Sequence, residues 1–390
     1  MNLDNVGVWN GHGDRVVPCS QSRGQDPRPR LVFLLGNGFT LDAIQHIAKI
    51  SGQLNITDTL RARVDDLLPA DTSVQYHSLH GNNDQFDTGV LWDPKIWPQL
   101  VSAFAKRDCQ SAMDFFKEVA VQESQNRGSA VGEWEVKFGT LQHELRSYLW
   151  YYFYDFTLKL RKYYKCLSRW EWLSMIGFAC RSCSVSVVSL NYDLLADDLI
   201  CSLVKQRAVP AQATCSLVEK KYHSVEQLGK DIIPVVKLHG CVSHHKEISP
   251  IYQPNSWLQA GSMKGCYVQG STKYCADFPQ PPQPPQMPDL VPPGQGWRTL
   301  LDKSNWTHEY VQQLLQSADI VVSTGISAAD PDAEEMERVL GYMRDSSKMY
   351  NVVVKEDGAN LFSKQCESMC RGYESVKREE LQGFIRKLFG

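Results

Sequence analysis

Five short apolar runs stand out against a largely polar background along this chain. They cover residues 31–35, 185–190, 232–238, 319–324 and 352–355, and the last four are rich in valine and isoleucine. Each run is too short for a helix and has a composition that favours strands. Because the runs are apolar almost throughout, rather than alternating with polar residues, they predict strands that are buried on both faces of a sheet.

Longer segments with a helical spacing of apolar residues separate these runs. One predicted helix begins near Leu41, and others cover roughly 92–127 and 135–178. The aromatic stretch 138–167 is apolar nearly all round, which is typical of a helix buried in a core or an interface; a ligand-stacking surface is the alternative. Strands that alternate with helices predict an α/β fold, a Rossmann-like and mostly parallel sheet with helices on both faces. The block at about 41–180 is then a helical insertion.

Two segments differ in composition from the rest of the chain. Residues 1–29 are polar and rich in Gly, Pro, Arg and Gln, which predicts a flexible N-terminal arm before a Rossmann domain over residues 30–390. Residues 279–293 are rich in proline, which lacks the N–H group that a sheet needs. We therefore expect an extended, proline-rich surface loop at 279–293.

The composition is that of an ordinary globular protein, with 43% hydrophobic and 22% charged residues over 390 positions. A net charge of -3 gives no general attraction to nucleic acid or to an anionic membrane. No apolar run is long enough to cross a membrane, and the first twenty residues lack the apolar core of a signal peptide. We therefore expect a cytoplasmic protein without membrane contact, whose twelve cysteines are mostly reduced.

Small or polar residues follow four of the predicted strands. Because the carboxyl ends of parallel strands lie at one edge of a sheet, these residues should meet in one crevice, where ligands of doubly wound sheets bind. Glycines at such a position let backbone N–H groups approach a phosphate at the start of the next helix. In chain order the four sequences are Gly36-Asn37-Gly38, Asn191-Tyr192-Asp193, His239-Gly240 and Gly325-Ile326-Ser327.

Each of these residues also has a purely structural interpretation. Asn191 could cap a helix that starts near Leu194, and Ser327 could cap the helix that carries Glu334. His239 could be a hydrogen-bonded turn residue, and glycine turns after strands are common. The common position of the four sequences favours a nucleotide site over four unrelated turns.

The ordered motifs GNGF, SLNYD, KLHG and STGIS resemble those of the sirtuin-like superfamily. They are most similar to the bacterial sirtuin-like NAD hydrolases of anti-phage defence. The resemblance implies that NAD is bound as a substrate and that Asn191 and His239 are catalytic. Asn191 would hold the nicotinamide ribose and help to place a water, and His239 would be the general base. The remaining implied contacts with NAD are Gly36, Asn37 and Gly38 in the first turn, with the glycines at the pyrophosphate, Asp193 at the carboxamide, and Gly325 and Ser327 at phosphate or ribose.

Two differences between this sequence and the motifs of these families limit what the resemblance implies. Deacetylating sirtuins carry two close cysteine pairs between the third and fourth motifs, whereas residues 241–324 hold only Cys241, Cys266 and Cys275. We therefore predict no metal and no protein-deacetylase groove; a Cys/His zinc site that includes His244 and His245 is the alternative. The first turn is also similar to the abortive-infection sequence Gly-Asn-Gly-Phe-Asp, but Thr40 takes the place of the aspartate.

The resemblance thus implies an NAD glycohydrolase that cleaves NAD to nicotinamide and ADP-ribose, as an abortive-infection effector that depletes NAD. The alternative is a non-hydrolytic module that senses NAD or ADP-ribose together with a partner protein. Since free NAD hydrolysis would poison the host, we expect regulation through a homo-oligomer or an activating partner. Such a partner could be an ATPase, a nuclease, an Argonaute-like protein or a phage component.

Overall fold

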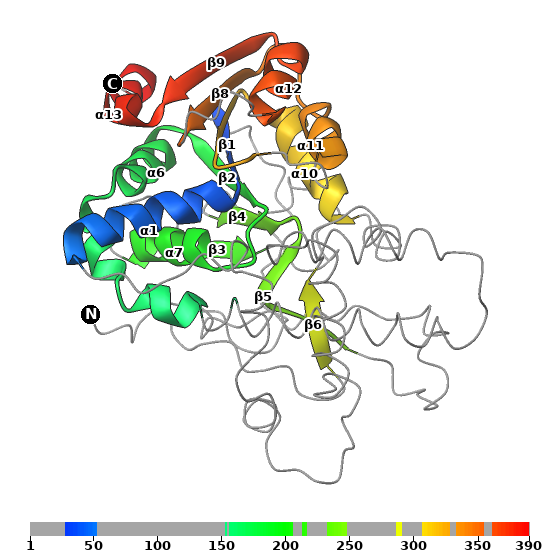
Figure 1. Ribbon diagram of the computed structural model, residues 1–390. Coiled ribbons are helices and arrows are strands. Elements are labelled where there is room, and N and C mark those ends of the chain that lie inside the picture. Colours follow the sequence, from blue (N-terminus) through cyan, green and yellow to red (C-terminus); the bar gives the residue numbers. More distant parts are fainter. Residues whose placement is uncertain are drawn as a thin grey trace, which may run out of the picture.

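A seven-stranded parallel sheet forms the centre of the computed structural model, with strand order β3-β4-β2-β1-β7-β8-β9 (Figure 1). The structure describes residues 28–52, 153, 156–205, 213–216, 232–247, 286–290, 306–327, 333–354 and 361–389. All six pairings between neighbouring strands of this sheet are parallel. The strands are β1 (Arg30–Leu35), β2 (Ser184–Ser189), β3 (Ala213–Ser216), β4 (Ile232–Lys237), β7 (Ile320–Thr324), β8 (Lys348–Val353) and β9 (Gly372–Lys377).

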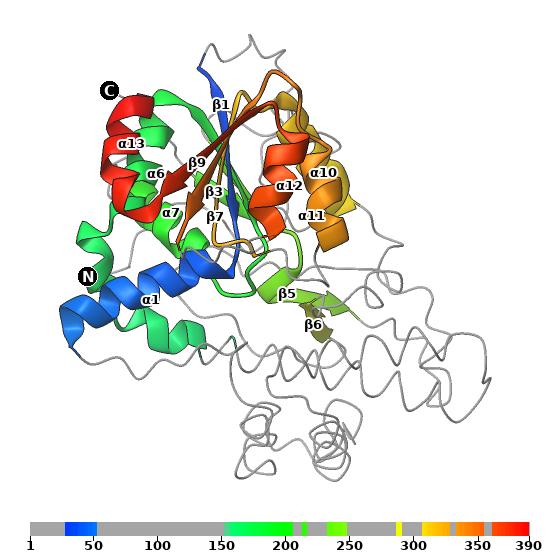
Figure 2. The ribbon, with the colours of Figure 1, turned by 45° about the horizontal axis from the view of Figure 1, so that its top comes forward.

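Helices cover both faces of the sheet, as Figure 2 shows. One face carries α1 (Asn37–Ser51), α6 (Glu171–Ser182), α7 (Leu195–Lys205) and α13 (Leu381–Phe389). The other face carries α10 (Trp306–Ser317), α11 (Ala333–Leu340) and α12 (Leu361–Met369). Two short 3-10 helices, η3 (Tyr164–Arg169) and η7 (Arg378–Glu380), precede α6 and α13. None of the helices in the described segments is long and apolar enough to cross a membrane.

The two-sided burial explains why β1 is apolar from Leu31 to Leu35. Leu31, Phe33 and Leu35 pack into the core beneath α1 and α6, whereas Val32 and Leu34 pack into the core beneath α10 and α11. Side chains alternate between the faces of a strand, so a strand covered on both sides favours apolar residues on both faces. The expected α/β, Rossmann-like sheet with helices on both faces is confirmed.

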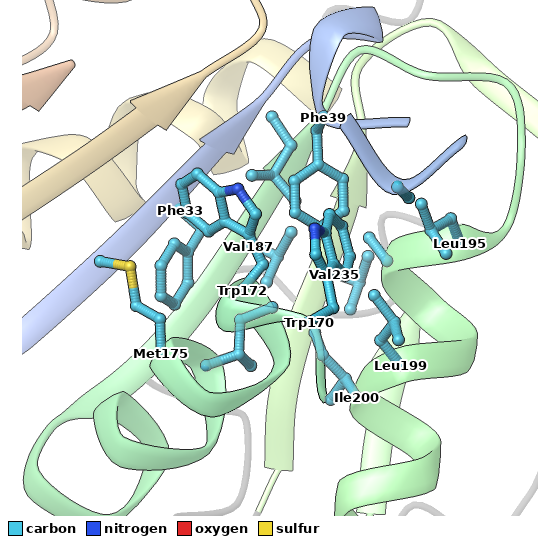
Figure 3. Packing of buried hydrophobic residues seen from close by; sticks show 14 of the residues in the cluster. Phe33, Phe39, Trp170, Trp172, Met175, Val187, Leu195, Leu199, Ile200 and Val235 are labelled. Atoms are coloured by element: carbon cyan, nitrogen blue, oxygen red, sulfur yellow. The ribbon is translucent and has the colours of Figure 1, made fainter. Parts of the chain in front are cut away.

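Aromatic residues anchor α1 on its face of the sheet (Figure 3). The Phe39 ring lies 5.0 Å from the ring of Trp170 and 5.6 Å from that of Trp172, between ring centroids. All three side chains are fully buried. Burial of aromatic area on this scale contributes several kcal/mol, roughly 1.5–3 for each side chain. Phe39 thereby holds the first turn of α1, and the glycine turn before it, against the sheet.

Several element boundaries differ from those expected. The first helix begins at Asn37 rather than near Leu41, and β8 begins at Lys348, four residues before the predicted run. The short strand β3 and the polar edge strand β9 were not predicted. Most of the predicted helical insertion at 41–180, and the arm up to residue 27, lie outside the described residues, so the domain boundaries stay predictions.

The prediction of a loop at 279–293 is wrong for one part of that segment. Residues Gln286–Leu290 form β6, which pairs antiparallel with β5 (Gly240–Glu247) in a second, two-stranded sheet. Pro288 lies opposite His245 in this pairing. In a two-stranded sheet both strands are edge strands, which tolerate proline because one side of each needs no N–H donor. The rest of the segment lies outside the described residues.

The chain order of the strands creates a switch point beside β1. After β1 the chain builds β2, β3 and β4 on one side, and it then crosses to β7, β8 and β9 on the other side. Ligands of open α/β sheets bind outside the carboxyl ends of the strands at such a point. The glycine turn after β1 and the turn after β7 lie at this position.

Candidate functional site

The strand register brings the four predicted sequences to one level of the sheet. Leu35 at the end of β1 pairs with Ser189 on β2 and with Thr324 on β7, and Ser189 pairs with Lys237 on β4. The last residues of four strands therefore lie in one row. The predicted residues Gly36, Asn191, His239 and Gly325 each follow that row by one or two positions. The prediction that these strand ends meet at one edge is confirmed.

The two glycine turns at the switch point interlock. The Gly36 N–H donates to the Thr324 carbonyl and the Gly38 N–H donates to the Gly325 carbonyl, each at 2.9 Å. A Cβ atom on Gly36 would lie 2.5 Å from the Gly325 carbonyl oxygen, and one on Gly38 would lie 2.5 Å from the Gly325 Cα. Gly325 itself has a φ of 70°, a conformation that favours glycine. These three glycines allow two backbone turns to pack in direct contact.

This packing changes the role expected of the first turn. The amides of Gly36 and Gly38, expected at the NAD pyrophosphate, already donate to carbonyls of the turn after β7. Asn37 is the first residue of α1, and an amide at that position has no carbonyl one turn earlier in its helix. It is therefore the best placed amide of this turn for an anion. The cofactor contacts of Gly36, Asn37 and Gly38 stay predictions.

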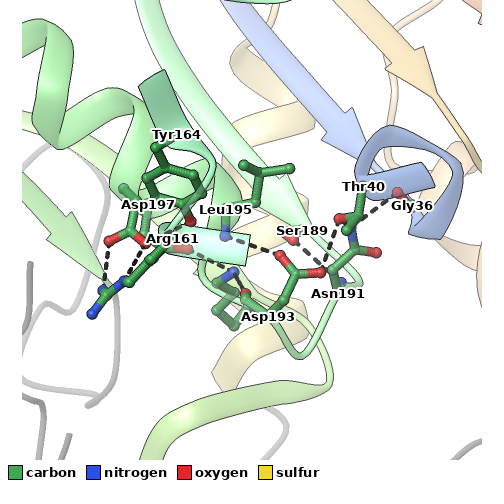
Figure 4. Close-up of polar contacts among 11 residues, drawn as sticks. Gly36, Thr40, Arg161, Tyr164, Ser189, Asn191, Asp193, Leu195 and Asp197 are labelled. Carbon is green, nitrogen blue, oxygen red and sulfur yellow. Dashed lines mark hydrogen bonds and ion pairs between the residues drawn. The ribbon is translucent and has the colours of Figure 1, made fainter. Parts of the chain in front are cut away.

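The side-chain amide of Asn191 is fixed in one orientation (Figure 4). Its Nδ2 donates to the Gly36 carbonyl and to the Thr40 hydroxyl, both at 3.0 Å. The Thr40 hydroxyl donates its proton to Asp193 Oδ2 at 2.8 Å, so its oxygen is left to accept from Asn191. A carbonyl only accepts, so both neighbours require the nitrogen of the amide on their side. No described residue donates to the Asn191 Oδ1 atom, which lies on the other side.

Asp193 accepts hydrogen bonds from Thr40 and from Leu195, the first residue of α7. Its Oδ1 accepts the Leu195 N–H at 2.9 Å, so Asp193, and not Asn191, makes the capping contact at the start of α7. The side chain is only 2% exposed, and this burial raises its pKa, while the Lys237 ammonium opposes the rise. Both carboxylate oxygens accept hydrogen bonds from residues of the chain. The contact with the nicotinamide carboxamide stays a prediction.

Lys237, the last residue of β4, connects this strand to the segment that follows β2. Its Nζ donates to the Asp193 carbonyl at 2.7 Å and pairs with Asp197 Oδ2 at 2.6 Å. Burial alone would lower the pKa of Lys237, but Asp197 and the other anionic neighbours outweigh it and raise the pKa. The ammonium is therefore a fixed positive charge in the core of the site.

His239 lies against a carboxylate that the sequence did not reveal. Its Nε2 is 2.7 Å from Glu335 Oε2, and His308 Nε2 is 3.1 Å from Glu335 Oε1. His239 and Glu335 are each 6% exposed. The Tyr192 ring, next to Asn191 in the chain, lies 6.2 Å from the His239 ring between centroids. His239 thus combines a buried anionic partner with a position at the same edge as Asn191.

The remaining predicted residues lie in the turn after β7. Gly325 is in contact with the first glycine turn, and Ser327 is exposed two residues further on. Residues 328–332, between Ser327 and α11, lie outside the described residues. The capping role considered for Ser327 and its contact with NAD both stay predictions.

The described segments contain no cluster of three or more His, Cys, Asp or Glu side chains that could hold a metal ion. The seven cysteines whose side chains the structure describes are free thiols. Cys266 and Cys275 lie outside the described residues, so the alternative of a Cys/His zinc site stays open.

The sheet order and the polar residues at its carboxyl edge define a doubly wound, Rossmann-like α/β protein with a candidate nucleotide site at the switch point. No protein-family model matches the chain, and no curated protein matches it. Among solved structures, the chain is similar to a mutant Sir2 homologue in complex with ADP-ribose. The two chains are 14% identical over 92% of each, with a TM-score of 0.26. At this score the likeness carries no argument about the site.

Proposed function

We propose that this protein is an NAD glycohydrolase that cleaves NAD to nicotinamide and ADP-ribose. The proposal is supported by the order of the four motifs and by the register that aligns the strand ends that carry them. The single observation that carries it is the locked amide of Asn191, with its Oδ1 turned away from Gly36 and Thr40.

The chemistry of the reaction explains why this orientation matters. When the glycosidic bond of NAD breaks, its electron pair moves to the nicotinamide ring nitrogen, and positive charge develops on the ribose carbon. A fixed carbonyl oxygen stabilises that charge, whereas an amide NH₂ group at the same place would oppose it. A flipped Asn191 would lose two hydrogen bonds, so the chain itself selects the favourable orientation.

His239 is the proposed general base of the hydrolytic step. Water forms the new bond to the ribose carbon, its proton passes to the imidazole, and the products are neutral nicotinamide and ADP-ribose. General base catalysis of this kind contributes about 10²–10⁴-fold to the rate. The Glu335 carboxylate lies 2.7 Å from the imidazole, and this negative charge favours the protonated form that the step produces.

The proposal is tested by incubation of the purified protein with NAD and measurement of nicotinamide release. Asn191→Ala and His239→Ala are expected to lower the rate by about 10²-fold or more. His46→Gln is the matched control, because His46 lies on α1 about two turns beyond the glycine turn. Tight NAD binding without turnover under any condition would favour the sensing module instead.

The biological role that we propose is NAD depletion in abortive infection against phage. The support is the resemblance of the motifs, together with the cost of uncontrolled NAD hydrolysis to the host. We therefore propose that a homo-oligomer, a partner protein or a phage component controls the activity. A monomer with full activity in the absence of any trigger would contradict this part of the proposal.

A further inference from the structure

The Glu335 carboxylate lies between two imidazoles that come from different elements. His239 follows β4 and His308 lies in the first turn of α10, while Glu335 itself lies in the first turn of α11. The contacts are 2.7 Å to His239 and 3.1 Å to His308. Since α10 precedes β7 and α11 follows it, both helices begin at the carboxyl edge of the sheet. All three side chains therefore belong to the edge that carries Asn191.

The direction of these hydrogen bonds follows from the chemistry of the groups. An ionised carboxylate only accepts, so each histidine donates through Nε2–H. With its proton on Nε2, neutral His239 takes up a further proton at Nδ1. The carboxylate thus selects one tautomer of His239 and fixes the plane of its ring.

His308 contacts the second oxygen of Glu335 through Nε2 alone. The Nδ1 atom of His308 is buried and has no hydrogen-bond partner among the described residues. A protonated Nδ1–H in that position would be an unsatisfied buried donor, which is unfavourable. His308 thus contacts one oxygen of the carboxylate through Nε2, and the other oxygen faces His239.

We propose that Glu335 is the positioning residue of His239: it fixes the tautomer and ring orientation and raises the affinity of the imidazole for a proton, while His308 orients the carboxylate. The catalytic consequence rests on the proposed function, in which His239 takes the proton of water. The imidazolium that forms would lie beside a buried anion, which stabilises it. Glu335 does not touch the reacting atoms in this proposal.

Other described groups around His239 do not replace this carboxylate. The Tyr192 ring packs near the imidazole, and the Lys237 ammonium is held by Asp197 and the Asp193 carbonyl. Asp193 is bonded to Thr40 and to the start of α7. Among these neighbours, Glu335 is the carboxylate within hydrogen-bond distance of the ring.

The experiment compares Glu335→Gln with Glu334→Gln in the full chain. Gln has nearly the size of Glu and can still accept a hydrogen bond, so the first variant removes mainly the charge. Glu334 is the adjacent, exposed residue of the same turn, so the second variant removes an equal charge from the same helix. Two measurements are made: nicotinamide release as a function of pH, and NMR titration of the histidine ring nitrogens, with His239 assigned from a His239→Gln variant.

Glu335→Gln is expected to lower the midpoint of the His239 titration by about one pH unit or more, because the opposite charge at this distance is lost. The rate of nicotinamide release should fall by about tenfold or more, and the acid limb of its pH profile should move to lower pH. Glu334→Gln should change neither measurement. In the wild-type protein the ring nitrogen signals should report a neutral His239 that is protonated on Nε2.

Two results would overturn the proposal and leave the proposed function intact. One is an active wild type with Glu335→Gln within about twofold of its rate. The other is a His239 midpoint that does not move. If the wild type releases no nicotinamide, the proposed function fails, and the titration alone decides whether Glu335 positions His239. If Glu335→Gln does not fold, the tautomer in the wild type and the midpoint in His308→Gln decide, because loss of His308 should disturb the same carboxylate.

Discussion

The Thr40 hydroxyl determines which way the Asn191 amide faces. Thr40 donates to Asp193 and can therefore only accept from Asn191, at 3.0 Å. Asn191 donates to Thr40, and Thr40 donates to Asp193. These two hydrogen bonds connect the loop after β2 to α1. The Thr40 hydroxyl thus connects two residues of the loop after β2, Asn191 and Asp193, through hydrogen bonds.

Replacement of Thr40 tests this connection. Thr40→Val keeps the branched shape but removes the hydroxyl, so Asn191 loses one anchor and Asp193 loses one donor. We expect nicotinamide release to fall by about tenfold or more, with a loss of about 1–2 kcal/mol in the free energy of unfolding. Thr40→Ser keeps the hydroxyl and should retain most activity. A Thr40→Val variant with the activity of the wild type would show that the amide needs no such anchor.

The contact between the two glycine turns predicts that a single added methyl group lowers the stability of the fold strongly. In Gly325→Ala the new Cβ would lie 2.2 Å from the Phe39 backbone nitrogen, and backbone atoms cannot move aside as a side chain can. We expect a loss of about 2 kcal/mol or more in the free energy of unfolding, measured by denaturant titration. Gly52→Ala is the control, because Gly52 also has a positive φ, of 65°, but a Cβ there would meet no atom of the described residues within 4 Å. That variant should lose only about 1 kcal/mol, from backbone strain alone.

The buried ion pair of Lys237 and Asp197 should contribute more to stability than an ion pair at the surface. Lys237→Met leaves a buried aspartate without its partner, and we expect a loss of about 3–5 kcal/mol in stability. The control is Lys387→Met, since Lys387 pairs with Glu374 at the surface, where the two side chains are 63% and 46% exposed. The second change should lower the unfolding midpoint far less, because an exposed ion pair contributes little to stability. Equal effects in thermal unfolding would contradict the assignment of Lys237 to the core.

Buried thiols predict how stability depends on alkaline pH. Burial raises the pKa of Cys180 to about 12 and that of Cys370 to about 11. These groups stay protonated in the folded chain while the unfolded chain ionises above about pH 9, so the stability that they contribute is present below that pH and is lost as the pH rises through the folded values. Unfolding midpoints should therefore fall above about pH 9, and less so in Cys180→Ala than in the wild type at equal starting stability.

The same burial makes a prediction for thiol chemistry. At about pH 8 a disulfide reagent should modify the half-buried Cys166 faster than Cys180 or Cys370. Mass spectrometry of peptides after a short reaction would give the order of modification. Early modification of Cys180 would mean that α6 leaves the sheet more often than its packing implies.

The sequence predicted the centre of the fold because the central strands are buried on both faces. β1 is apolar from Leu31 to Leu35, and β2, β4 and β7 are built around runs of Val and Ile; the residues of the candidate site follow their ends. The polar strands were harder to find. β9 is an exposed edge strand, and β8 contains Asn351, which is buried but satisfied by a 2.9 Å hydrogen bond from Ser323. A buried polar residue with a partner on the next strand has no signature in a local pattern.

Local sequence patterns also could not identify the residues that contact the site residues. Glu335 precedes no strand and follows none directly, and its contact with His239 spans 96 residues of the chain. The bond between Thr40 and Asp193 spans 153 residues. Strand ends can be aligned from the sequence once a parallel sheet is assumed, whereas contacts between helices and strand ends depend on how each helix is rotated about its axis.

The central position of β1 has a consequence for synthesis of the chain on the ribosome. The Arg30 amide at the start of β1 bonds to Asp319, which lies 289 residues later. While the intervening chain is made, the β1 edge that β7 will cover stays unpaired and apolar, and an open edge of this kind invites association with other chains. Closing so long a loop is also slow. Newly made copies should therefore depend on a chaperone until β7 emerges and completes the sheet.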